Sequence, residues 1–247
     1  MTFYRPQHEN IAELLRSANR DLLMGSRCFF GGGTAIVLKN GEYRQSLDLD
    51  FLCADTDGYR KLRNALQEQG IGAIFPVEAK PLREIQADGY GIRTLLEYKG
   101  QRIRFEIVRE ARIELNGDID PVLLVPVLSV EDMFAEKLLA NSDRCFDRAV
   151  CYRDAIDLGR LVEAHHHIPA AAVEKAERAY GADIARKMSG VLNLLLNRGL
   201  VETVARELDM SDDAAISAVS NLRLEVIRIW PHAGIQSEQS PDERNDL

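Results

Sequence analysis

The chain of 247 residues is 46% hydrophobic and 28% charged, the balance of an ordinary globular protein with a sizeable core. Its formal net charge of −8 argues against broad, non-specific binding to nucleic acid, which needs many Lys and Arg contacts to phosphate, although a local basic patch is compatible with it. The sequence contains no uninterrupted run of about 18 apolar residues, so we expect no membrane-spanning segment.

The first residues and the cysteines indicate a cytoplasmic protein. The N-terminus lacks the apolar core of a secretory signal peptide. The four cysteines show no C-x-x-C spacing, and Cys28 and Cys53 stand in apolar strand contexts that are typical of small buried side chains. A reducing compartment fits this pattern best.

The first predicted elements lead to a run of glycines. Residues 8–24 carry apolar side chains at helical spacing, which predicts one helix packed against a sheet. An apolar strand then runs into Gly32, Gly33 and Thr34, which open a short helical segment. Glycine lets backbone N–H groups approach a phosphate closely, and the start of a helix adds a favourable dipole. These three residues are candidate nucleotide-binding residues, and a plain turn is the alternative.

A second strand follows and carries two aspartates. Because side chains alternate along a strand, Asp48 and Asp50 share one face while apolar residues fill the other. Two adjacent carboxylates repel each other unless a cation lies between them. Mg²⁺ typically takes one or two carboxylates together with substrate phosphates, so the pair is a candidate Mg²⁺ site, with Mn²⁺ possible. Ser46, just ahead, could contact phosphate, and solvated charge is the alternative for the aspartates.

The next elements are a helix and a hairpin. Residues 59–69 predict a helix that stops at Gly70, whereas residues 71–89 give no clear assignment. A hairpin is predicted from strands at 93–98 and 102–109 joined by a Lys-Gly turn. Glu106 lies on the polar face of its second strand and is a candidate third metal ligand beside Asp48 and Asp50. The alternative is a cross-strand ion pair with an arginine.

The second half of the chain changes from strands to helices. Residues 121–126 predict a short apolar strand, and Ser129 followed by Asp132 indicates the start of a helix. The chain is then predicted to be helical almost to its end, at 130–142, 149–166, 170–180, 182–197, 200–208 and 212–230. We therefore expect an α+β fold, with an N-terminal mixed sheet and helices at 1–128, a helical domain at 129–230 and a disordered tail at 231–247.

Two charged residues interrupt the apolar stripes of the helical region. Lys137 lies within the stripe of the helix at 130–142, and Asp154 lies on or beside the stripe of the next helix. A buried charge without a partner is strongly disfavoured, so each needs the other or a bound phosphate. An interhelical salt bridge is the structural alternative to a role in an active site.

In combination, these motifs resemble the nucleotidyltransferase (polymerase-β-like) superfamily. The residues Gly32-Gly33-Thr34-Ala35, followed by Ser46-Leu47-Asp48-Leu49-Asp50, look like the first motif of its AbiEii/AbiGii toxin family. The later segments Glu136-Lys137-Leu138-Leu139-Ala140 and Arg153-Asp154-Ala155-Ile156-Asp157-Leu158 look like its later motifs. The resemblance implies that Asp48, Asp50, Lys137 and Asp154 are catalytic and that Lys137 also binds the nucleotide phosphates.

The resemblance further implies an enzyme that uses Mg²⁺ to move a nucleoside monophosphate from an NTP to an acceptor hydroxyl. It implies the toxin of a type IV-like toxin–antitoxin or abortive-infection system, with tRNA as the leading acceptor and a cognate antitoxin encoded nearby. Modification of a small molecule, as by aminoglycoside nucleotidyltransferases, is the alternative chemistry. A nucleotide-binding module without catalysis is the third interpretation.

Overall fold

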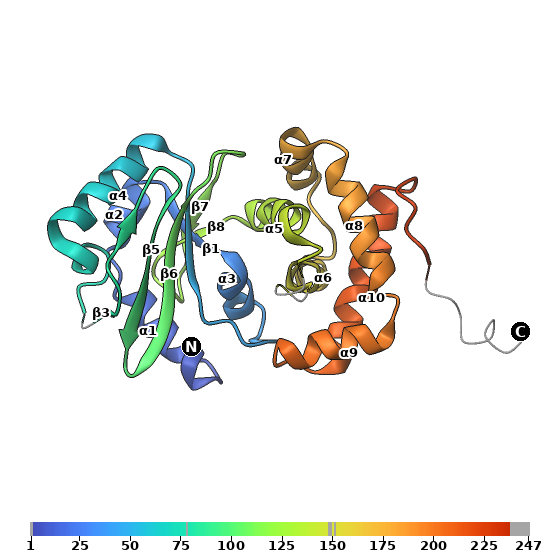
Figure 1. The fold of residues 1–247 in the computed structure, drawn as a ribbon, viewed down its shortest axis with the longest axis horizontal. Coiled ribbons are helices and arrows are strands. Elements are labelled where there is room, and N and C mark those ends of the chain that lie inside the picture. Colours follow the sequence, from blue (N-terminus) through green and yellow to red (C-terminus); the bar gives the residue numbers. More distant parts are fainter. Residues whose placement is uncertain (1, 78, 148–149, 151, 238–247) are drawn as a thin grey trace, which may run out of the picture. The chain divides into compact units, whose positions relative to one another are not determined.

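The computed structural model of the protein describes residues 2–77, 79–147, 150 and 152–237 (Figure 1). It divides into two compact units, Met1–Glu136 and Lys137–Leu247. The division falls inside helix α5 (Val130–Arg144), whereas the sequence placed the domain boundary at residue 128, directly before that helix. The expected combination of a mixed sheet with helices and a helical C-terminal region is confirmed.

The first unit is built on a mixed sheet in the order β3-β5-β6-β2-β1-β8-β7, with β4 paired to β5. The strand direction reverses once at the centre of the sheet, because β1 and β2 are antiparallel, whereas β2 runs parallel to β6 and β1 runs parallel to β8. The strands are β1 (Cys28–Gly31), β2 (Leu49–Cys53), β3 (Lys80–Pro81), β4 (Gln86–Ala87), β5 (Gly91–Tyr98), β6 (Gln101–Arg109), β7 (Gly117–Ile119) and β8 (Pro126–Leu128).

Helices cover both sides of this sheet. Helices α2 and α4 lie on one side and α3 on the other (Figure 1). The helices of this unit that precede α5 are α1 (Pro6–Arg16), α2 (Arg20–Gly25), α3 (Gly32–Lys39) and α4 (Thr56–Gln69), with a 3₁₀ turn η1 at Gly70–Ala73. Helix α4 ends where predicted, because Gly70 adopts a φ of +61° that a side chain would disfavour.

The predicted single helix at 8–24 is wrong, since the chain forms α1 and α2 there. Ser17 turns its hydroxyl back to the carbonyl of Leu14, and the side chain of Asn19 accepts the N–H of Leu22. Such side-chain hydrogen bonds compete with the helical backbone pattern and start a new helix. The apolar side chains keep their helical spacing across residues 17–19, although the helical backbone is interrupted there.

Four phenylalanines hold the sheet to its covering layer. Phe30, Phe51 and Phe105 stand on the adjacent strands β1, β2 and β6, with ring centroids 5.4 and 6.1 Å apart, and Phe75 meets Phe105 edge-on at 5.5 Å. All four are fully buried. Aromatic pairs of this kind bury large areas and add about 0.5–1.5 kcal/mol each beyond that burial. They fix the face of each strand, and so turn the intervening polar residues to the opposite face.

The hairpin predicted at 93–109 is confirmed, whereas the strand predicted at 121–126 is not. Strands β5 and β6 pair from Gly91, which lies opposite Val108, up to the turn Lys99-Gly100, where both residues have positive φ. The segment 121–126, predicted as a strand, instead forms the turn between β7 and β8. Asp120 accepts hydrogen bonds from the N–H groups of Val122 and Leu123, which closes the turn and leaves only Pro126 in a strand.

The second unit consists of the end of α5 followed by five helices within the part of the chain that the structure describes. They are α6 (Arg153–His165), α7 (Ala170–Tyr180), α8 (Asp183–Leu194), α9 (Arg198–Glu207) and α10 (Asp212–Ile229). The helix predicted to begin at 149 begins at Arg153, and residues 148, 149 and 151 lie outside the described ranges. Helices α6 and α10 touch at Gly159, where an added Cβ would lie 2.1 Å from the carbonyl oxygen of Ala218.

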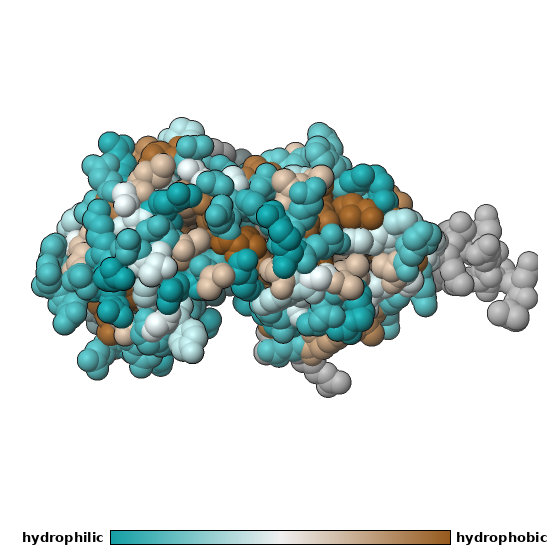
Figure 2. Space-filling model, turned by 90° about the horizontal axis from the view of Figure 1, so that it is seen from above, coloured by the Kyte–Doolittle hydropathy of each residue, from teal (hydrophilic) through white to brown (hydrophobic). Residues whose placement is uncertain are grey.

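The start of the predicted disordered tail is held in place. The carbonyl of Gln236 accepts a hydrogen bond from Arg223, and its N–H donates to the side chain of Asn193. Residues 231–237 therefore lie against α8 and α10, and residues 238–247 of the predicted tail lie outside the described part of the chain. Most side chains on the face seen in Figure 2 are hydrophilic, with small apolar patches among them. Among the described residues, no helix is both long and apolar enough to cross a membrane.

Candidate active site

The site begins at the turn from β1 into α3. Gly31 stands directly before α3 and has no side chain with which to cap its first turn, and Gly32 opens the helix at a φ of +68°. The first N–H groups of a helix have no partner within it, and the helix dipole favours an anion there. The predicted order of strand, glycine run and short helix is confirmed, and Gly33 and Thr34 occupy the next two helical positions. This turn can present backbone donors to a phosphate.

Asp50 lies against that turn. It pairs in register with Gly31 on β1 and with Glu106 on β6, so it stands at the centre of three adjacent strands. A Cβ added to Gly32 would lie 2.5 Å from Oδ2 of Asp50. Only glycine at this position leaves room for the carboxylate. The two sequence motifs, the glycine run and the aspartate strand, therefore meet at atomic contact.

Asp48 lies just outside the strand on which the sequence placed it. Strand β2 begins at Leu49, and Asp48 is the residue before it. Its Oδ1 is 3.9 Å from Nε of Arg104, and both side chains are substantially exposed. An exposed pair at this distance is worth little, so the carboxylate of Asp48 is accessible to a stronger cation.

Glu106 occupies the position expected for a third acid. It is opposite Asp50 in the parallel pairing of β2 and β6, and its Oε1 is 3.9 Å from Nη1 of Arg93 on β5. Both features that the sequence left open, proximity to Asp50 and an arginine partner, are thus present. Among the residues that the structure describes, no three His, Cys, Asp or Glu side chains are grouped closely enough to hold a metal by themselves.

The donor set nevertheless fits a hard divalent cation that shares its ligands with a substrate. Asp48 and Asp50 supply carboxylate oxygens, which Mg²⁺ prefers, and Mg²⁺ commonly uses one or two carboxylates and completes its octahedron with phosphates and water. The space beside Gly32, which a Cβ would fill, leaves the carboxylate of Asp50 facing the turn that can bind phosphate. Glu106 on the neighbouring strand and an oxygen of a triphosphate are the further ligands that such a cation would need.

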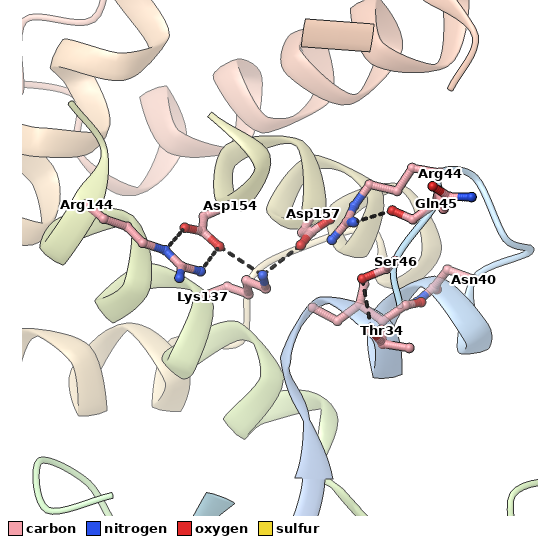
Figure 3. A network of polar contacts seen from close by, with 10 residues as sticks. Thr34, Asn40, Arg44, Gln45, Ser46, Lys137, Arg144, Asp154 and Asp157 are labelled. Carbon is pink, nitrogen blue, oxygen red and sulfur yellow. Dashed lines mark hydrogen bonds and ion pairs between the residues drawn. The ribbon is translucent and has the colours of Figure 1, made fainter. Parts of the chain in front are cut away.

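A pair of hydroxyl groups joins the helix to the loop ahead of the aspartates. Oγ1 of Thr34, in the first turn of α3, is 2.9 Å from Oγ of Ser46 (Figure 3). Thr34 is fully buried, whereas Ser46 is half-buried. Ser46 is therefore oriented by Thr34, and of these two predicted nucleotide-binding residues it is the one with access to solvent.

Lys137 and Asp154 form a buried ion-pair cluster in the second unit. Nζ of Lys137 is 2.9 Å from Oδ1 of Asp154 and 2.6 Å from Oδ2 of Asp157, and Arg144 binds both oxygens of Asp154 at 2.8 and 3.0 Å (Figure 3). The sequence analysis allowed either Asp154 or a bound phosphate as the partner of Lys137, and the structure shows the contact with Asp154. The helix that carries Asp154 and Asp157 contributes two charges on one face, since they are three residues apart.

The cluster holds the carboxylate of Asp154 ionised. Burial alone would raise the pKa of Asp154, but the charge of Lys137 and the hydrogen bonds and charge of Arg144 outweigh it and hold that pKa well below its usual range. Arg144 was not among the predicted site residues, and the signal that could have found it was the presence of two acids, Asp154 and Asp157, beside a single buried lysine.

Comparison with known proteins gives a family match that covers these motifs. The family model described as "Nucleotidyl transferase AbiEii toxin, Type IV TA system" matches residues 13–225. The chain belongs to this family. The AbiEii match spans the glycine turn, both aspartates and the Lys137 cluster. No curated protein matches the chain.

Two solved structures share the fold of this AbiEii family member. The crystal structure of JHP933 from Helicobacter pylori has a TM-score of 0.54 at 19% identity, covering 93% of this chain and 96% of that one. A second Helicobacter pylori structure, named provisionally as a nucleotidyltransferase, has a TM-score of 0.53 at 19% identity, covering 91% of this chain and 95% of its own. At this identity the likeness shows the fold alone.

Proposed function

We propose that the protein is a Mg²⁺-dependent nucleotidyltransferase that moves a nucleoside monophosphate from an NTP to an acceptor hydroxyl, with tRNA as the acceptor. The observation that carries the proposal is the contact of Asp50 with Gly32, because it joins an acid suited to a metal with a helix start suited to a phosphate. Membership of the AbiEii family supports the same reaction class.

The roles of the chain's residues follow from their chemistry. The N–H groups at the start of α3 and the hydroxyl of Ser46 bind the triphosphate, and Asp48 and Asp50 hold the metal, with Glu106 available from the neighbouring strand. When bound, Mg²⁺ would neutralise phosphate charge and lower the pKa of the attacking hydroxyl. Overall, the acceptor oxygen bonds to the α-phosphorus, the bond from that phosphorus to pyrophosphate breaks, and the hydroxyl proton passes to water.

Lys137 and Asp154 are proposed as active-site residues because their segments resemble later motifs of the family, whose model covers both positions. The two carboxylates around Nζ fix the direction of the lysine side chain. A fixed cation whose ion pairs already exist needs little reorganisation when charge develops on a phosphate, which is the arrangement that lowers a transition state most. Arg144 orients Asp154 and leaves Lys137 the shorter contact with Asp157.

The biological role proposed is that of a toxin in a type IV-like toxin–antitoxin or abortive-infection system. Its substrates, NTPs and tRNA, place it in the cytoplasm, and an antitoxin encoded nearby would be its partner. Inducing the wild-type chain in a bacterium should stop growth, whereas the Asp48→Ala variant at the same level should not. Growth arrest by both would separate toxicity from the chemistry proposed.

The reaction is tested by Asp50→Asn, which keeps the shape of the side chain and removes its charge. Transfer of labelled nucleotide from each NTP to total tRNA should fall by about a hundredfold or more, as when one electrostatic contact to a transition state is lost. Asp118→Asn, an exposed aspartate on β7, is the matched control and should transfer normally. Label transfer to aminoglycosides with none to tRNA would favour the small-molecule alternative, and full activity of Asp50→Asn would refute the metal assignment.

A further inference from the structure

A buried histidine links α1 to the loop ahead of the aspartates. His8 is 0% exposed, and its Nδ1 lies 2.9 Å from Oε1 of Glu42. The backbone N–H of Ser46 donates to Nε2 of the same ring at 3.3 Å. Both partners belong to the segment between α3 and β2, so one side chain of α1 contacts that segment at two points.

The two contacts select one protonation state of the ring. Burial alone would raise the pKa of Glu42, but hydrogen bonds from the N–H groups of Tyr4 and Arg5 and from His8 outweigh it and lower that pKa. Glu42 is therefore ionised and can only accept, so Nδ1 must carry a proton. The N–H of Ser46 can only donate, so Nε2 must offer its lone pair. Burial lowers the pKa of His8, in agreement with a neutral ring.

The segment that His8 contacts is held by individual hydrogen bonds. Residues 42–48 form neither helix nor strand, so no ladder of backbone hydrogen bonds sets their path. Ser46 sits within this stretch, with its N–H on His8 and its hydroxyl on Thr34, and Asp48 follows two residues later. The position of the loop toward the start of α3 thus depends on individual contacts, and the one from His8 reaches the backbone N–H of Ser46 itself.

We propose that His8 is a positioning residue, whose neutral ring fixes the backbone of Ser46 and thereby places Ser46 and Asp48 toward the triphosphate and its metal. This inference rests on the proposed function. It assigns a role in the site to a residue of the first helix, outside all the motifs that point to nucleotidyl transfer. His8 itself touches no substrate in this role, since it is fully buried.

Two amide substitutions separate the two contacts of the ring. In asparagine the amide atoms stand one bond beyond Cγ, as Nδ1 does, so His8→Asn can keep the hydrogen bond to Glu42 and loses the one to Ser46. In glutamine they stand two bonds beyond Cγ, as Nε2 does, so His8→Gln can present its oxygen to the N–H of Ser46. The pair is matched in polarity and differs in which contact survives. Urea unfolding shows that each variant is folded before it is compared.

The first measurement is amide hydrogen exchange at Ser46 by NMR, and the second is calorimetric binding of Mg²⁺ with α,β-methylene analogues of the four NTPs. A single net hydrogen bond of about 1 kcal/mol corresponds to roughly fivefold, so in His8→Asn the Ser46 amide should exchange about fivefold faster and the analogue should bind about fivefold more weakly. His8→Gln should restore both values to near those of the wild type.

The outcomes distinguish this inference from the function on which it rests. Equal weakening in both variants, or wild-type binding by His8→Asn, would overturn the positioning role while the transferase proposal stands. Failure of the wild-type protein to bind any of the analogues would refute the proposed function instead. In that case the exchange rates at Ser46 would still decide whether His8 holds the loop.

Discussion

Gly32→Ala is the substitution that tests the contact between the glycine turn and the acid strand most directly. Gly32 has a φ of +68°, a conformation that costs a residue with a side chain about 1–2 kcal/mol. The smaller conformational freedom of alanine in the unfolded chain offsets about 0.4–1 kcal/mol of that cost. The backbone effect alone therefore predicts a loss of about 1 kcal/mol in the free energy of unfolding.

The side chain of the new alanine adds a second effect that is local to the site. Its Cβ would lie 2.5 Å from Oδ2 and 2.9 Å from Cβ of Asp50, whereas ordinary contact begins at 3.4 Å. Because β2 is paired on both sides, its backbone is held in place, so the turn at residue 32 and the carboxylate of Asp50 must move apart by roughly 1 Å. A shift of that size can cost about a hundredfold in rate. An off-rotamer side chain costs a further 0.5–1.5 kcal/mol or so.

The control is Gly100→Ala in the turn between β5 and β6. Gly100 has a φ of +76°, and an added Cβ there meets nothing within 4 Å, so this variant carries the same backbone strain without the contact. Urea unfolding should show losses of about 1 kcal/mol for Gly100→Ala and about 2 kcal/mol for Gly32→Ala. Transfer of labelled nucleotide should fall about a hundredfold in Gly32→Ala alone. Wild-type transfer by a folded Gly32→Ala protein would refute the assignment of this turn to the active site.

Two further predictions concern buried charges. Lys137→Met leaves the carboxylate of Asp157 buried without its lysine and should destabilise the protein by about 3–5 kcal/mol in urea unfolding at pH 7. The lowered pKa of Asp154 contributes stability that is present above the ordinary pKa of aspartate and is lost as pH falls. The loss of unfolding free energy caused by Lys137→Met should therefore become smaller in acid. A loss that does not change with pH would contradict the ion-pair account. Burial and the charge of Glu110 raise the pKa of Glu136 well above its usual value. The contribution of Glu136 to stability is therefore present below the ordinary pKa of glutamate and is lost as pH rises through the raised pKa. Glu136→Gln should therefore gain stability over the wild type as pH rises from 4 to 8, and unfolding curves that stay parallel across that range would disprove it.

Features with a local cause could be read from the sequence. The hairpin of β5 and β6 follows from alternating side chains around Lys99-Gly100. Tight two-residue hairpin turns favour positive φ at both central residues, and glycine adopts it without strain. The start of α5 follows from Ser129, whose hydroxyl accepts the N–H of Asp132 three residues later. In both cases the residues that fix the element lie within a few positions of one another, so no distant contact was needed to predict it.

Other elements were misjudged because apolar periodicity records which side chains are buried and not what the backbone does between them. Residues 8–24 have one continuous apolar pattern, yet Asn19 caps a second helix within it. Residues 121–126 are apolar like a strand, yet the side chain of Asp120 folds them into a turn. A single polar side chain that bonds to the backbone overrode the pattern in each case.

The sequence by itself determined the chemistry of this protein: which residues carry oxygen ligands, which glycines free the backbone, and which buried charges need partners. Only the tertiary structure decided that Asp50 lies against Gly32, that Glu106 stands beside Asp50, and that Lys137 is held by two aspartates and not one. It also placed His8 on the loop of Ser46, from 38 residues away. The physical reason is that contacts between distant segments depend on strand order and register, which the packing of the whole core selects and no local pattern encodes.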